Sequence, residues 1–310
     1  MLNIAHRGFS GKYPENTLLA FQKGIEAGAD GFEFDTHLTR DGEIVIIHDE
    51  RLDRTTNAQG FVKDYTLEEL RKVDASKPFP ECGFCGIPTL REYFELIRGR
   101  DLITNIELKN GIFWYEGMEE KVIAMIREYG LEERVILSSF NHRSVMKCKA
   151  LAPEIRCGFL TMSWLERPGE YTAARGVECY HPLYLTLDRE TVDERNGNGI
   201  RINTWTVNEE ADLARMKELG VDAVIGNFPD RAAADCRDGA AQALPPSGAL
   251  RRSRPSVQAP PEPALTGPLP GVYLRAAAGP HAGHTHDSAT VRQGEGTYLI
   301  VNDCGAGQLE

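Results

Sequence analysis

Hydrophobic and polar positions along the first three quarters of the chain follow two alternating periods. Short apolar runs of strand length are separated by segments with the 3.6-residue period of amphipathic helices. The pattern predicts nine strands: Leu2–His6, Gly31–Asp35, Ile44–His48, Leu102–Leu108, Val135–Phe140, Arg156–Leu160, Glu178–Tyr184, Ile200–Val207 and Ala223–Asn227. The clearer predicted helices are Asn16–Ala27, Glu116–Tyr129, Arg143–Leu151 and Glu209–Leu219, with Asn16 and Asn208 as candidate N-caps.

One predicted strand does not fit a regular alternation of strands and helices. Ile44–His48 follows Asp41 and Gly42, and Asp-Gly between two strand-like runs favours a tight antiparallel hairpin. An antiparallel partner cannot be the next parallel strand, so eight strands remain. We therefore predict a distorted (β/α)₈ barrel of the TIM type over residues 1–237, with an insertion at about residues 36–104 between its second and third strands. A doubly wound α/β sheet is the alternative, but no G-x-G-x-x-G follows the first strand.

The composition changes at about residue 238. Residues 238–310 hold nine of the 17 prolines and no lysine. Sequence this rich in Pro, Ala and Gly buries too little apolar surface to offset the entropy of the chain. We expect a low-complexity, disordered tail with one short strand near Thr297–Val301.

Charge and composition exclude several classes of protein. The 310 residues are 41% hydrophobic and carry a formal net charge of −11, which argues against binding to nucleic acid. No apolar run reaches the roughly 18 residues of a membrane span, and the N-terminus MLNIAHRGF lacks the features of a secretory signal. The seven cysteines are irregularly spaced, and Cys82-x-x-Cys85 has no second ligand pair. We interpret them as reduced thiols and expect a cytoplasmic protein.

Acidic side chains gather at the predicted strand ends, where barrels of this type carry their active sites. Glu33 and Asp35 are two positions apart on one strand, and Glu107 and Lys109 repeat this spacing on the third barrel strand. Because side chains two apart on a strand share a face, three acids and a lysine are expected at one mouth. Like charges this close need neutralisation, and all-oxygen ligands favour Mg²⁺, Ca²⁺ or Mn²⁺. The alternative is a Glu107–Lys109 salt bridge beside two solvated acids.

Two histidines accompany these acids at the ends of predicted strands. His6 ends the first strand and precedes Arg7, and His48 ends the hairpin strand. Imidazole titrates near neutral pH and suits general acid–base catalysis. Arg7 and Lys109 provide positive charge for a phosphate group. The combination of two histidines, a divalent cation and two fixed cations favours cleavage of a phosphodiester.

Five longer segments carry these residues in a specific combination. They are AHRGFSGKYPENTLLAF, GFEFDTHLTRDGEIVIIHDERLDRTTNAQG, IPTLREYFEL, NIELK and NTWTVN, spread over residues 4 to about 228. With these segments the chain resembles the glycerophosphodiester phosphodiesterase family, and the resemblance stops before the tail.

The resemblance implies a fold, a reaction and a set of site residues. Family members are distorted (β/α)₈ barrels with a small insertion after the second strand. They hydrolyse small-molecule glycerophosphodiesters to sn-glycerol 3-phosphate and an alcohol. The motif match implies that one divalent cation, Mg²⁺ or Ca²⁺ with Mn²⁺ as a third choice, is held by Glu33, Asp35 and Glu107. It also implies an acid–base pair of His6 and His48 and phosphate binding by Arg7 and Lys109.

Several alternatives stay open at this level. Trp205 either walls the alcohol pocket, where its face suits a choline ammonium, or belongs to the core. The nucleophile is either water or the glycerol 2-hydroxyl. A lysophospholipase D-like enzyme is a rival interpretation that needs an apolar channel or patch, and a non-catalytic phosphodiester-binding barrel is a second. The oligomeric state is not specified.

Overall fold

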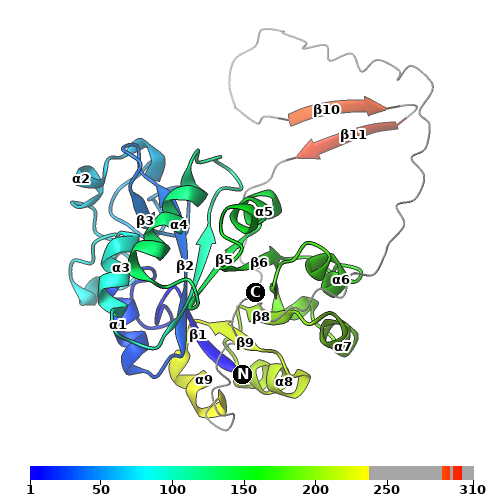
Figure 1. Ribbon diagram of the computed structural model, residues 1–310. Helices are drawn as coiled ribbons and strands as arrows, with labels where there is room; N and C mark the ends of the chain where they lie inside the picture. The colour runs from blue at the N-terminus through cyan, green and yellow to red at the C-terminus, as the bar shows by residue number, and fades with distance from the viewer. Residues whose placement is uncertain (237–287, 294–295, 302–310) are drawn as a thin grey trace. The chain divides into compact units, whose positions relative to one another are not determined.

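The computed structural model describes residues 1–236, 288–293 and 296–301, and its main body is a closed barrel (Figure 1). Its parallel strands are β1 (Leu2–His6), β2 (Gly31–Leu38), β4 (Ile103–Leu108), β5 (Val135–Ser139), β6 (Arg156–Thr161), β7 (Cys179–Pro182), β8 (Arg201–Trp205) and β9 (Ala223–Gly226). They follow one another around the sheet, and β1 pairs with both β9 and β2. This closure confirms the (β/α)₈ prediction, and the doubly wound alternative is wrong.

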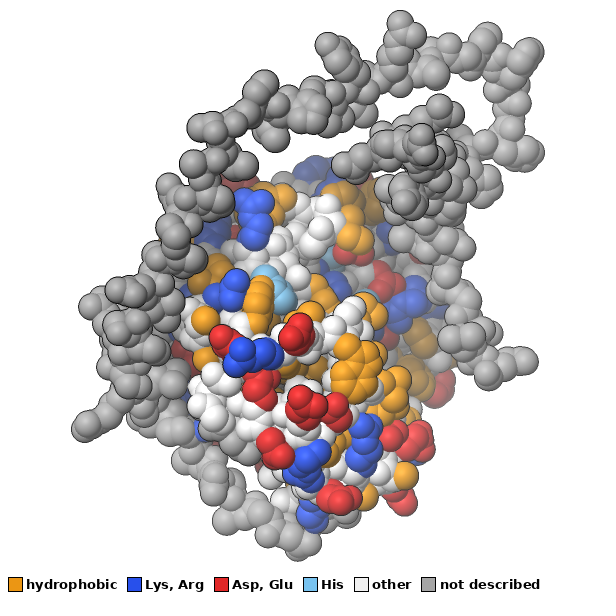
Figure 2. Space-filling model, turned by 90° about the vertical axis from the view of Figure 1, so that its right-hand side faces the viewer, with side chains coloured by type: hydrophobic (Ala, Val, Ile, Leu, Met, Phe, Trp, Pro, Cys, Tyr) orange, Lys and Arg blue, Asp and Glu red, His pale blue; other side chains and the backbone are white. Residues whose placement is uncertain are grey.

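Helices follow the barrel strands and surround them (Figure 1). They are α1 (Leu18–Glu26), α3 (Leu90–Ile97), α4 (Met118–Tyr129), α5 (His142–Leu151), α6 (Pro168–Ala173), α7 (Arg189–Asn198), α8 (Glu210–Leu219) and α9 (Pro229–Cys236). Figure 2 shows the side covered by α6, α7 and α8, where acidic and basic side chains are interspersed. None of the helices in the described part of the chain is long and apolar enough to cross a membrane.

The insertion begins with the predicted hairpin. Strand β3 (Ile44–Ile46) pairs antiparallel with the end of β2, with Thr36 opposite Ile46. Gly42 supplies the positive φ of 81° that the turn requires. Two short 3₁₀ segments, η1 (Val62–Asp64) and η2 (Pro80–Cys82), and the one-turn helix α2 (Leu67–Leu70) follow. The insertion has its own small core of Val45, Ile47, Leu52, Val62, Leu70, Val73, Ala75 and Ile87.

Packing of β2 against the helices decides which of its side chains face the barrel interior. Phe32 and Phe34 make edge contacts with Phe21 of α1 and Tyr93 of α3, with ring centroids 4.5–6.2 Å apart. Since successive side chains of a strand alternate between faces, Glu33 and Asp35 point into the barrel. The outward aromatic pair therefore fixes the inward direction of the two acids.

Both predicted asparagine caps are wrong. Helix α1 is capped by Thr17, whose side chain accepts a hydrogen bond from the backbone N–H of Ala20 at 3.2 Å. Helix α8 begins at Glu210 without a side-chain cap, and Asn208 Oδ1 accepts a hydrogen bond from the backbone N–H of Asn227 at 2.8 Å. Asn16 instead donates a hydrogen bond to Asp35 of β2, and Asn208 holds the segment that follows β9.

A separate two-stranded unit lies in the tail. β10 (Ser288–Gln293) and β11 (Gly296–Val301) pair antiparallel, with Thr290 opposite Leu299. The short strand expected near Thr297–Val301 falls within β11. The disorder expected for the other residues of the tail lies outside the described residues, and the domain boundary near residue 237 stays a prediction.

Candidate active site

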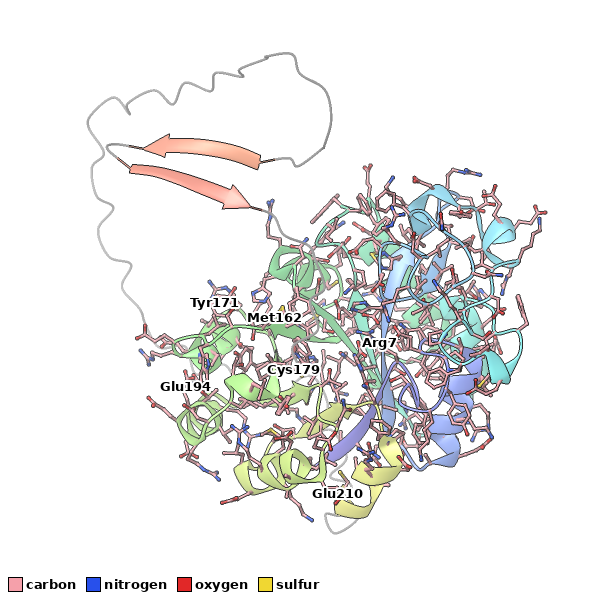
Figure 3. The ribbon with its side chains drawn as sticks, turned by 180° about the vertical axis from the view of Figure 1, so that it is seen from behind. Arg7, Met162, Tyr171, Cys179, Glu194 and Glu210 are labelled. Atoms are coloured by element: carbon pink, nitrogen blue, oxygen red, sulfur yellow. The ribbon has the colours of Figure 1, made fainter. Side chains whose placement is uncertain are left out.

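One pocket opens at the carboxyl ends of the barrel strands. Its polar side comes from β1, β2, the segment after β3, and β4, and consists of His6, Arg7, Glu33, His48, Asn105, Glu107 and Lys109. Its other side is mainly apolar and consists of Phe140, Leu160, Met162, Trp205, Thr206 and Ile225. Figure 3 labels Arg7, directly after β1, and Met162, directly after β6.

Three carboxylates form the centre of the polar side. Glu33, Asp35 and Glu107 each contribute an oxygen atom within 4.8 Å of the other two. Asp35 lies opposite Glu107 in the β2–β4 register. Glu33 and Asp35 are 5% and 1% exposed, so the alternative with two solvated acids is wrong.

The burial of these acids sets their protonation. Burial, together with the charges of Asp35 and Glu107, raises the pKa of Glu33 well above its ordinary range. Burial acts in the same direction on Asp35, but the charges of Arg7, His48 and Lys109 hold its pKa below the ordinary value. The cluster is therefore under electrostatic stress that added positive charge relieves.

The cluster fits a divalent cation. Glu33 Oε2 and Asp35 Oδ1 are buried and have no hydrogen-bond partner within the protein. Buried carboxylate oxygens without partners are costly, and a bound cation removes that cost. Three oxygen donors match the preference of hard divalent cations.

Two basic side chains lie beside the acids. Arg7 Nη1 donates to Glu15 Oε1 at 2.9 Å, and its Nε lies 3.3 Å from Asp35 Oδ2. Arg7 has a positive φ of 56°, an unusual conformation for a residue other than glycine. Lys109 Nζ lies 3.1 Å from Glu107 Oε1. Both cations thus line the pocket while held by carboxylates.

His6 is fixed through one ring nitrogen. Its Nδ1 lies 2.6 Å from Asn227 Oδ1, which also accepts a hydrogen bond from Ser10 Oγ. An amide oxygen accepts only, so His6 Nδ1 carries the proton. Its Nε2 is left on the side of the acids, 3.7 Å from Glu33 Oε2. Burial and the charge of Arg7 lower the pKa of His6 to about 3, so the ring is neutral.

His48 is held in the same manner by a carboxylate. Its Nδ1 lies 2.5 Å from Asp49 Oδ1, and its Nε2 lies 3.2 Å from Lys109 Nζ. His37, which shares a strand face with the acids, does not line the pocket. It is buried, and its Nε2 lies 3.0 Å from the backbone oxygen of His48. His37 therefore supports His48.

Arg54 connects the two halves of the polar side, and sequence reasoning did not single it out for this role. Its Nε donates to Asp49 Oδ2 at 2.6 Å. Its Nη1 and Nη2 donate to Glu15 Oε2 and Oε1 at 2.9 and 2.8 Å. One guanidinium thus holds the partner of His48 and the partner of Arg7 together. No local pattern links Arg54 to Glu15, because the contact spans 39 residues.

Two further asparagines belong to the site. Asn16 is buried, and its Nδ2 donates to Asp35 Oδ2 at 3.0 Å. Asn105 lies opposite Glu33 in the register and lines the pocket. Asn105 is two positions before Glu107, so the spacing rule that found the acids also indicates Asn105. Asn16 gives no such signal.

Trp205 borders the apolar side of the pocket. Its indole N–H donates to the backbone oxygen of His181 at 2.9 Å, and its ring makes an edge contact with Phe140 at 5.6 Å. His181 is buried and lies 3.0 Å from Asn203 Nδ2. The structure therefore places Trp205 at the pocket wall in a fixed orientation.

The comparisons with known proteins agree with this geometry. The sequence profile of the glycerophosphoryl diester phosphodiesterase family matches residues 6–231. Glycerophosphodiester phosphodiesterases of Caldanaerobacter subterraneus subsp. tengcongensis and Bacillus altitudinis are 48% and 45% identical to this chain, over 74% of it and 95% of each relative. A solved phosphodiesterase of Oleispira antarctica, in complex with the product sn-glycerol-3-phosphate, is 32% identical with a TM-score of 0.68, over 76% of this chain and 96% of that one.

The fold, the pocket and these relatives define an enzyme that hydrolyses phosphoric diesters. The chain belongs to the glycerophosphoryl diester phosphodiesterase family. The prediction of an enzyme is thereby confirmed, and the resemblance seen in the sequence motifs holds over residues 6–231.

Proposed function

We propose that this enzyme hydrolyses glycerophosphodiesters to sn-glycerol 3-phosphate and an alcohol with one divalent cation and two histidines. One observation carries the proposal. The Nε2 sides of His6 and His48 face the same pocket as the acidic cluster. Glu33, Asp35 and Glu107 would hold Mg²⁺, Ca²⁺ or Mn²⁺. A cation bound there supplies positive charge to the phosphate oxygens and offsets the charge that grows in the transition state.

Arg7 and Lys109 bind the phosphate in this proposal. Both line the pocket, and their present carboxylate partners leave part of each donor set free for a ligand. Arg7 offers a planar fork and Lys109 a compact ammonium. Arg7 Nε lies 3.3 Å from Asp35 Oδ2. The proposed phosphate site therefore lies beside the proposed cation site.

The two histidines exchange protons with the substrate. Each has its Nδ1 committed to a fixed acceptor, Asn227 for His6 and Asp49 for His48. One histidine removes a proton from the nucleophile, which is water or the glycerol 2-hydroxyl. The other protonates the leaving alkoxide. Trp205 walls the pocket for the alcohol, where its ring face suits a cationic headgroup.

The test is product analysis on glycerophosphocholine with cation-loaded enzyme. The proposal expects release of sn-glycerol 3-phosphate and choline, and a loss of roughly 10²–10⁴-fold in rate for His6→Ala and for His48→Ala. His142→Ala is the matched control, because His142 lies outside the pocket lining, hydrogen-bonded to Tyr171 and to the Leu160 backbone. Full activity of a folded His48→Ala protein would reject its catalytic role.

A further inference from the structure

The floor of the pocket carries a buried amide that has no hydrogen-bond partner. Asn105 is 3% exposed and lines the pocket from β4. It stands two positions before Glu107, so its side chain lies one layer deeper in the barrel. Neither its Nδ2 nor its Oδ1 has a hydrogen-bond partner in the described part of the protein. Since unpaired buried polar atoms are costly, both atoms of this amide are available to a ligand.

The barrel interior beneath Asn105 leaves little room for a partner. A small cavity lies there, toward the amino ends of the strands, with a volume of about 10 Å³. At most one water fits a space of that size. The lining is mainly aliphatic and includes Leu2, Ile4, Ile103 and Ile136, whereas a buried water needs two to four polar partners. The partners of the Asn105 amide are therefore expected from the pocket on its other side.

The pocket offers different surroundings to the two substituents of a phosphodiester. Phe140 and Trp205 form part of an apolar side, which the proposed function gives to the alcohol. The floor is polar, because Asn105 lies opposite Glu33 in the β2–β4 register and Glu33 Oε2 is also unpaired. Each glycerol hydroxyl both donates and accepts a hydrogen bond, as the amide does through its two atoms. The glycerol part of the substrate is therefore the substituent that matches the floor.

We infer that Asn105 binds the glycerol hydroxyls of the substrate and makes the pocket selective for phosphates that carry them. This inference rests on the proposed function, because the glycerol phosphate has to occupy the same pocket. Asn105 Nδ2 donates to a hydroxyl oxygen, and Oδ1 accepts from a hydroxyl group. An alkyl phosphate without hydroxyls leaves both amide atoms unpaired. A site built to hydrogen-bond a hydroxyl strongly rejects the analogue that lacks it.

The test measures binding, so that its result does not depend on which group is the nucleophile. The two ligands are sn-glycerol 3-phosphate and n-propyl phosphate, which share the phosphate and the three-carbon chain and differ by two hydroxyls. Isothermal titration calorimetry on cation-loaded protein gives both dissociation constants. We expect the original protein to bind sn-glycerol 3-phosphate at least roughly tenfold more tightly than n-propyl phosphate. Equal affinities would overturn the inference before any variant is made.

Two substitutions of Asn105 should reduce this preference. Asn105→Leu fills the same space without polar atoms, and we expect the ratio of the two dissociation constants to fall roughly tenfold. Asn105→Ala should lower the ratio less, because a water can take the place of the amide. Asn203→Ala is the matched control. Asn203 is also buried and borders the small cavity, but it lies outside the pocket lining, with Nδ2 3.0 Å from His181 Nε2. The control should lose stability and keep the preference.

Metal content and turnover of glycerophosphocholine are measured on the same samples. An unchanged preference in folded Asn105 variants, or an equal loss in Asn203→Ala, would overturn the inference while turnover by the original protein leaves the proposed function standing. Weaker cation binding by the Asn105 variants with an unchanged preference at saturating cation would assign the amide to the cation, and would also overturn the inference. Cation-loaded original protein that neither binds sn-glycerol 3-phosphate nor hydrolyses glycerophosphocholine would overturn both.

Discussion

Asp49 Oδ1 lies 2.5 Å from Nδ1 of His48, which leaves His48 Nε2 toward Lys109 and the pocket. A neighbouring hydrogen bond decides which ring nitrogen carries the proton. The pair therefore defines the tautomer that His48 presents to the pocket, and His6 and Asn227 do the same with an amide in place of the carboxylate.

Replacing Asp49 by Asn should weaken catalysis without unfolding the protein. An amide can present its N–H₂ to Nδ1 and stabilise the wrong tautomer. We expect kcat to fall at least about tenfold, but less than in His48→Ala. Steady-state kinetics with circular dichroism on the same samples checks this. An unchanged kcat would show that the carboxylate does not set the state of His48.

Arg54→Lys should impair proton transfer by His48 and phosphate binding by Arg7 at once. Lysine cannot donate simultaneously to Asp49 and to both oxygens of Glu15 from a planar fork. We expect kcat to fall through His48 and KM to rise through Arg7, with a combined loss in kcat/KM of at least about tenfold.

Arg51→Lys is the control for that variant. Arg51 lies three residues earlier in the same loop and also donates two hydrogen bonds to one carboxylate, that of Asp53. It lies outside the pocket lining, and its side-chain hydrogen bonds in the described part of the chain go to Asp53 and not to a partner of His48 or Arg7. Equal kinetic effects of Arg51→Lys and Arg54→Lys would contradict the positioning role of Arg54.

Gly8 should tolerate a side chain less well than other glycines of positive φ, because two separate requirements meet there. Its φ is 82°, and a Cβ atom would lie 2.7 Å from backbone and side-chain carbons of Ala20. Gly83 has a similar φ of 70° but open space around it. Gly83→Ala should cost about 1 kcal/mol of unfolding free energy from backbone strain, and Gly8→Ala about 1–3 kcal/mol more from the clash. Urea denaturation of both variants measures the difference, and equal losses would argue against the close approach.

His181 should make the protein sensitive to acid. Burial lowers its pKa to about 3, whereas in an unfolded chain it is about 6.5. Between these two pKa values, His181 binds a proton in the unfolded chain but not in the folded chain. The stability from neutral His181 is thus present above about pH 6.5 and is lost as the pH falls toward 3.

His181→Gln should therefore flatten the pH dependence of stability. We expect the slope of unfolding free energy between about pH 6 and pH 4 to become shallower by up to about 1.4 kcal/mol per pH unit. Urea titrations across this pH range measure the slope for the original protein and for the variant. The comparison of slopes does not depend on the absolute stability of the variant. Parallel slopes would mean that His181 is protonated in the folded protein.

Local sequence patterns predicted the parts of the site that depend on strand geometry. The two-residue spacing of Glu33 and Asp35 placed both acids on the inward face, and Asp41-Gly42 placed β3 in an antiparallel hairpin. Both follow from backbone rules that act over a few residues. The assigned roles of these acids stay predictions.

Contacts between distant segments could not be read in the same way. Arg54 meets Glu15 across 39 residues, and Asn227 meets His6 across 221. Asn16 looked like a helix cap because asparagine is common there, yet Thr17 caps the helix and Asn16 donates to Asp35. Both Asn16 and Thr17 are residue types that suit an N-cap. The hydrogen bond from Asn16 to a distant strand leaves the cap to Thr17.

The most direct test of the proposed mechanism is the dependence of turnover on a divalent cation. The protein is stripped with a chelator, its metal content is measured, and sn-glycerol 3-phosphate release from glycerophosphocholine is followed with and without Mg²⁺, Ca²⁺ or Mn²⁺. We expect no release from stripped protein and recovery with at least one of the three ions. We also expect no recovery for a folded Glu33→Gln variant, which lacks one carboxylate of the cluster. Undiminished release by protein verified to be free of metal would contradict it.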